Sequence, residues 1–99
     1  MARNNTLTEI PQRVWTPLTN ADATAVRVQN RSPSAILLSA TNGATEPSDL
    51  NGALELGAGQ TMAADLTLAQ LWPGVSGANR LWAWSDMDPL ITTVSVSHA

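Results

Sequence analysis

The chain has 99 residues with no cysteine and no lysine, and eight acidic residues outnumber its five arginines, which gives a net charge of −3. The length predicts a single domain, and the missing cysteines exclude disulfides and thiolate metal sites. The acidic balance argues against a protein that binds nucleic acid through its phosphates, and no apolar run approaches the roughly 18 residues of a membrane span.

The first eight residues are polar and follow no pattern, so the sequence predicts a flexible arm over residues 1–8 and a single domain over residues 9–99. The arm has no apolar segment of the kind found in signal peptides. Residues 13–18 then alternate as a strand does. Because Pro17 cannot donate a backbone hydrogen bond, we expect this strand at the edge of a sheet or ending there.

Residues 24–31 alternate between apolar and polar side chains, with Val26 and Val28 on one face. After a Ser-Pro-Ser break, residues 35–40 are apolar on both faces, which predicts a central strand. A break of this length between two strand-like runs is typical of a hairpin. We therefore expect these two strands to pair with each other.

The middle of the chain is rich in turn residues. Its longest loop is expected over residues 41–52, followed by short strands over residues 53–56 and 60–66. The second of these strands carries Met62 and Leu66, which we expect to contact the core because they are its large apolar side chains.

Thr67 and Gln70 have the spacing of a capping box, so the sequence predicts a helical turn over residues 67–72, which a Pro-Gly pair ends. Two further alternating runs follow, over residues 80–85 and 91–98. The whole pattern amounts to about seven short strands punctuated by glycine and proline. It predicts an all-β fold, a small β-sandwich of jelly-roll-like form with one short helical turn.

The residues that could carry chemistry are isolated from one another. His98 is the only histidine, and no nucleophile motif surrounds the serines near it. Asp86 and Asp88 share one proline-ended turn, where acidic residues are ordinary turn formers. Asp49 begins only a fragment of a calcium-loop pattern. We therefore expect no enzyme, with no catalytic residue, no bound cofactor and no metal site.

The composition of the surface points to protein partners. The four tryptophans are the only aromatic residues, and charged residues make up 13% of the chain, about half the usual share. Surfaces that protein neighbours cover are poor in lysine and glutamate and rich in tryptophan, although drift in a small protein would also lower the charge. Trp82 and Trp84 share one face of their strand, where they either fill the core or form an exposed pair that docks on a partner.

Five residues are the candidates for partner binding: Trp15, Arg27, Arg31, Trp82 and Trp84. Trp15 lies on the strand that Pro17 limits. Arg27 and Arg31 form a polar row on their strand, which is either a solvated sheet face or a site for the acidic groups of a neighbouring subunit.

Three stretches of the sequence resemble small structural proteins of the virions of tailed bacteriophages. They read VQNRSPSAILLSAT, then LELGAGQTMAADLTLAQLWPGVSGANRLWAWS, and finally VSVSHA. In that family a strand with the pattern VxN, a turn with LxxGQ and a closing strand recur in a compact sandwich. The resemblance covers residues 10–99. It is a general similarity of sequence and not a diagnostic motif, so no site residue is assigned from it. It implies a protein that decorates or reinforces a capsid, often as a trimer at a symmetry axis.

From these features we expect a capsid decoration or cement protein, assembled in the host cytoplasm and located on the capsid surface of the virion. Its partners would be the major capsid protein and further copies of itself, with a homotrimer favoured by the resemblance, and neither nucleic acid nor a membrane. The alternative is a carbohydrate- or receptor-binding module on the tail or the particle surface, which would use Trp82 and Trp84.

Overall fold

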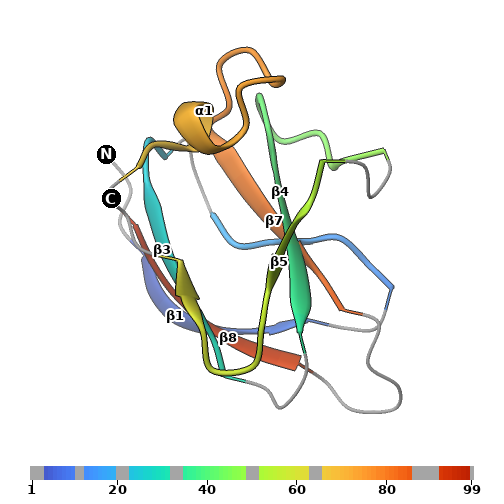
Figure 1. Cartoon of the computed structure of the whole chain (residues 1–99), viewed down its shortest axis with the longest axis vertical. Coiled ribbons are helices and arrows are strands. Elements are labelled where there is room, and N and C mark those ends of the chain that lie inside the picture. The colour runs from blue at the N-terminus through green and yellow to red at the C-terminus, as the bar shows by residue number, and fades with distance from the viewer. Residues whose placement is uncertain are drawn as a thin grey trace.

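A computed structural model describes residues 4–10, 13–19, 23–31, 35–48, 52–62, 66–85 and 92–98. These residues form eight strands and one short helix (Figure 1). In chain order the elements are β1 (Asn4–Ile10), β2 (Thr16–Pro17), β3 (Val26–Asn30), β4 (Ile36–Thr41), β5 (Leu54–Leu56), β6 (Thr61–Met62), α1 (Leu68–Leu71), β7 (Arg80–Trp84) and β8 (Thr92–His98).

The strands form two antiparallel sheets of four strands each. The first sheet has the order β1-β8-β3-β6, and the second sheet has the order β2-β7-β4-β5. The first strand therefore pairs with the last, the second with the seventh, the third with the sixth and the fourth with the fifth. This is the connectivity of a long hairpin rolled up into two layers, which is a jelly roll. The predicted all-β sandwich of jelly-roll-like form is confirmed.

The core lies between the two sheets and is built from the alternation of each strand. Val26 and Val28 of β3 face it from the first sheet, while Leu38 of β4 and Leu81 of β7 face it from the second. All four side chains are fully buried, and each such burial contributes about 1.5 to 3 kcal/mol. Arg27 and Gln29, which alternate with the buried residues of this strand, point outward, so the predicted alternation of this strand is correct.

The predicted hairpin between the second and third strand-like runs is wrong. β3 lies in the first sheet and β4 in the second, so the chain crosses from one layer to the other between them. Each strand has an apolar face to bury, and the jelly roll satisfies both by placing the two faces across the core from each other. Two other expectations are confirmed. The run over residues 35–40 forms an interior strand, β4, and the strand with Pro17, β2, lies at the edge of its sheet.

Residues 4–8 of the predicted arm belong to β1, which pairs with β8 along its whole length, from Asn4 opposite His98 to Ile10 opposite Thr92. The arm was predicted because the segment has no apolar pattern, but backbone pairing needs none. A second difference concerns β6, which is only two residues long. Met62 packs against the core as expected, whereas Leu66 lies beyond the strand and is 47% exposed.

Helix α1 closes one end of the sandwich (Figure 1) and has the predicted capping box. The backbone N–H of Gln70 donates to Thr67 Oγ1 at 3.1 Å, and the backbone N–H of Thr67 donates to Gln70 Oε1 at 2.8 Å. Trp72, at the end of the helix, is buried in the core cluster. Its Nε1 donates to the carbonyl oxygen of Gly52 at 3.1 Å, so this tryptophan is structural.

Candidate functional site

Three of the four tryptophans lie on the outward face of the second sheet. In β7, Leu81 and Ala83 belong to the core cluster. Trp82 and Trp84 alternate with them along the strand and therefore lie on the outward face of the sheet. Across the sheet, Trp82 lies opposite Pro17 of β2 and Ser39 of β4, while Trp84 lies opposite Leu37 of β4. We call this surface the tryptophan face, and it consists of Trp15, Pro17, Leu37, Ser39, Trp82 and Trp84.

Trp82 is buried although it lies outside the core. It is 8% exposed and does not belong to the core cluster. Its Nε1 donates to Thr41 Oγ1 at 2.9 Å, and the Thr41 hydroxyl donates in turn to the carbonyl oxygen of Gly43 at 3.0 Å. These bonds tie the indole to the loop that follows β4. Neither of the two alternatives for Trp82, a core residue or an exposed one, describes this position.

Trp15 and Trp84 form an aromatic pair beside Trp82. Their ring centroids are 5.5 Å apart and the rings are inclined at 56°, a tilted geometry typical of favourable aromatic contacts. Trp15 is buried and Trp84 is half-buried. Trp84 Nε1 is enclosed and has no hydrogen-bond acceptor among the described residues. The chain reaches this pair through Val14, which is 50% exposed.

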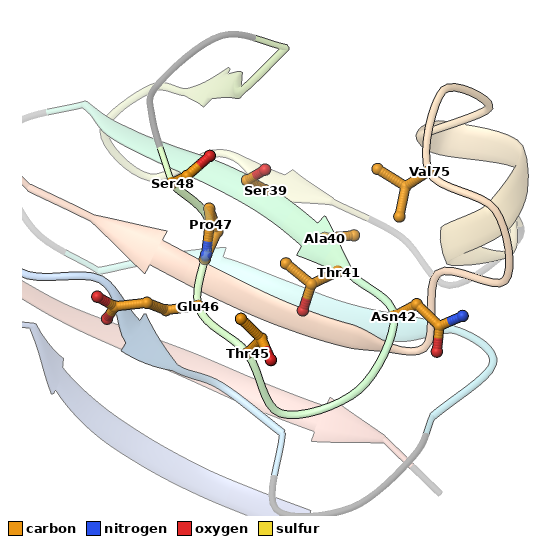
Figure 2. Close-up of a pocket in the computed structure, with 9 residues that line it drawn as sticks. All are labelled: Ser39, Ala40, Thr41, Asn42, Thr45, Glu46, Pro47, Ser48 and Val75. Atoms are coloured by element: carbon orange, nitrogen blue, oxygen red, sulfur yellow. The ribbon is translucent and has the colours of Figure 1, made fainter.

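A cavity of about 380 Å³ lies next to the tryptophan face. Figure 2 shows how it forms: the loop after β4 runs back alongside that strand, and the segment after α1 closes the other side. Its lining is formed by Ser39, Ala40, Thr41, Asn42, Thr45, Glu46, Pro47, Ser48 and Val75. Four of its nine residues carry a hydroxyl group, and Glu46 adds one carboxylate.

Arg27 and Arg31 lie on the other side of the molecule. Arg27 is exposed on the outward face of β3, and Arg31 is exposed just after that strand ends. In the first sheet Arg27 lies opposite Ser97 of β8, and Gln29 lies opposite Ser95. We call this polar surface, with Arg27, Gln29, Arg31, Ser95 and Ser97, the arginine face. The structure therefore divides the five candidates between two opposite faces, which cannot both contact one flat partner.

Of the histidine and the acidic residues that could carry chemistry, the structure describes only the backbone of His98. Asp49, Asp86 and Asp88 lie outside the described residues. The backbone of His98 lies at the end of β8, opposite Val26 of β3. Within the described parts of the chain, no three histidine or acidic residues are close enough to hold a metal ion, and no helix has the length and apolarity needed to cross a membrane.

Sequence reasoning missed the residues of β4 and its following loop that belong to this site. Ser39 looked like part of an apolar central strand and Thr41 like the start of the loop after it, yet Ser39 shares the tryptophan face and Thr41 holds Trp82. Their alternation with Leu38 and Ala40 was the available signal. Comparisons of this chain with models of protein families, with curated proteins and with solved structures find no match.

Proposed function

We propose that this chain is a non-enzymatic structural protein of a bacteriophage particle, a decoration protein that binds the outside of the capsid shell and reinforces it. The observation that supports this proposal is the tryptophan face. A sandwich needs only the inner face of each sheet to be apolar, but here the outer face of the second sheet holds three of the four tryptophans. Tryptophan is the residue most enriched where proteins bind each other.

The connectivity of the fold adds support by analogy. Jelly rolls of eight strands occur in viral capsid proteins and in lectins. A fold alone does not determine a function, so this analogy favours a capsid-type protein or a sugar-binding protein without choosing between the two. The low charge and the tryptophan face favour a protein partner over a sugar, because exposed lysine and glutamate are depleted where proteins associate.

Decoration would work through many weak contacts. Each copy would place the exposed rim of the tryptophan face, Pro17 and the accessible part of Trp84, against the major capsid protein. One small contact of this kind is weak, but copies that each bridge two neighbouring shell subunits gain affinity because their second contact is intramolecular. The arginine face would then point away from the shell.

Binding of purified protein to particles that lack it tests this proposal. We expect wild-type protein to sediment with the particles, and we expect Pro17→Glu to weaken binding by about tenfold or more because it buries a charge in the contact. Pro17 is exposed on the edge strand β2, so the variant should fold normally, which circular dichroism checks.

Two matched variants separate the two faces. Leu54→Glu places the same charge on another exposed apolar residue, at the edge strand β5, and should bind as the wild type does. The double variant Arg27→Ser with Arg31→Ser should also bind normally. If the arginine variant abolishes binding and Pro17→Glu leaves it unchanged, the contact lies on the arginine face. Wild-type protein that stays in the supernatant at every concentration contradicts decoration.

The cavity beside the tryptophan face favours one second candidate, a carbohydrate-binding module. Its lining offers the hydroxyls of Ser39 and Thr45 and the carboxylate of Glu46, which are groups that hydrogen-bond sugar hydroxyls. A screen against immobilised glycans distinguishes the two functions. Binding that Glu46→Gln abolishes would favour the carbohydrate module, and absence of glycan binding together with sedimentation on particles would favour decoration.

A further inference from the structure

The four edges of the two sheets are protected to very different degrees. An open edge pairs readily with another strand, so proteins shorten their edge strands or place proline and charges on them. β2 has two residues, one of them Pro17, and β6 also has only two. β5 has three residues with an exposed Glu55 at its centre. These three edges offer little backbone for a partner.

β1 is the exception. It has seven residues, it contains no proline, and Glu9 is its only charged residue. Each of its residues is in register with β8 on one side, and it is the terminal strand of the first sheet. In an antiparallel ladder alternate residues direct their N–H and C=O groups to opposite sides. The other side of β1 therefore presents a row of backbone donors and acceptors that no described strand uses.

We propose that the free edge of β1 pairs with β1 of a second copy of this chain, antiparallel across a two-fold axis at Leu7. The two first sheets would then join into one continuous sheet of eight strands. This inference does not depend on the proposed function, because it concerns the isolated protein in solution. It also replaces the trimer that the resemblance implies with a pairwise contact.

The sequence of β1 supports a second copy as the occupant, because the strand is self-complementary about its centre. With the axis at Leu7, that residue lies opposite its own counterpart, and Thr6 lies opposite Thr8. Threonine pairs are among the favourable neighbours across strands. Asn5 then lies opposite Glu9, so the two like charges are kept apart. An axis at Glu9 would instead place the two glutamates opposite each other, which is destabilising.

Single cysteines test the register, and the absence of any native cysteine makes the result unambiguous. In the proposed pair the two positions 7 face each other, within the span that a disulfide bridges. The two copies of position 5 are separated by about 13 Å along the strands, and so are the two copies of position 9. We expect Leu7→Cys to form a covalent dimer on mild oxidation about tenfold faster than Asn5→Cys, Glu9→Cys or the control Gln29→Cys.

Gln29→Cys is the control because Gln29 is exposed on β3, in the interior of the same sheet. Equal rates for all four variants would overturn the proposal, as would faster crosslinking at position 5 or 9. Each variant is checked for folding by circular dichroism.

Charge at position 5 provides a second measurement with no cysteine involved. Sedimentation equilibrium should show a monomer–dimer equilibrium for the wild type. Asn5→Glu places two like-charge pairs in the dimer and should raise the dissociation constant about three- to tenfold, whereas Asn5→Arg should lower it by a similar factor. Gln29→Glu and Gln29→Arg change the net charge by the same amounts, but on an interior strand, and should leave the dissociation constant unchanged. A wild type that is monomeric at millimolar concentration, or that assembles only into trimers, overturns the proposal.

Discussion

Replacing Trp82 by serine should lower the free energy of unfolding by about 3 to 5 kcal/mol, the loss typical of truncating a large buried aromatic residue. Trp82 is 8% exposed and its Nε1 donates to Thr41 Oγ1. The substitution removes the indole from between the sheet and the loop after β4, and it leaves that hydroxyl without its donor. A loss of this size approaches the whole stability of many small domains.

Urea denaturation followed by circular dichroism measures this loss, and two variants resolve its origin. Trp82→Phe keeps most of the apolar contact but removes the N–H, so we expect a smaller loss, which includes about 1 kcal/mol for the hydrogen bond. Trp84→Ser should cost less than Trp82→Ser because Trp84 is half-buried. A loss below about 1 kcal/mol for Trp82→Ser would contradict the role of Trp82 in holding the loop.

The second large effect is expected at Asn30, which joins the two sheets. Its side chain is fully buried, and Nδ2 donates to the carbonyl oxygen of Leu56 at 3.0 Å. Asn30 ends β3 in the first sheet and Leu56 ends β5 in the second. The backbone of Asn30 is also bonded, to Gln60 and to Gly59, both at 2.9 Å.

Asn30→Asp should destabilise the protein by about 3 kcal/mol or more at neutral pH, because an ionised carboxylate cannot donate and would face a carbonyl oxygen in a dry site. Burial raises the pKa of such a carboxyl group above its unfolded value of about 3.9. Between the two pKa values the folded state holds a proton that the unfolded state has lost. Stability should therefore fall as the pH rises above about 4, by up to 1.4 kcal/mol per pH unit.

Thermal unfolding of the variant and the wild type across pH 3 to 8 measures this dependence, with the range chosen to span the unfolded pKa of about 3.9. Gln29→Glu is the matched control, because it adds an acid at the exposed neighbouring position and should follow the wild-type profile. A loss of stability for Asn30→Asp that is the same at pH 3 and pH 8 would show that the introduced carboxyl group reaches water. In that case Asn30 does not hold the two sheets together through a dry hydrogen bond.

The parts of the fold that local chemistry determines were predictable from the sequence. The alternation of Val26 and Val28, the limit that Pro17 places on its strand and the Thr67–Gln70 capping box each depend on neighbouring residues only. Strand pairing does not, and the expected hairpin after β3 was wrong because the chain crosses to the other sheet there. β1 was missed for a related reason, since its partner is the opposite end of the chain.

The candidate site was predictable in part. The shared parity of Trp82 and Trp84 was visible in the sequence, and so was the core-facing parity of Leu81 and Ala83. The burial of Trp82 was not, because it depends on the loop after β4 and on the hydroxyl of Thr41. Asn30 has the same parity as Val26 and Val28, so alternation alone would have placed it inside. Its partner, the carbonyl group of Leu56, lies in the other sheet and only the structure identifies it.

Quantitative mass spectrometry of purified phage particles whose genome encodes this chain tests the proposed decoration of the shell most directly. We expect the protein in the particles at a copy number near that of the major capsid protein, because reinforcement requires a contact at most shell subunits. A handful of copies per particle would place it in the tail or neck, and particles that contain none of it would contradict a structural role in the virion.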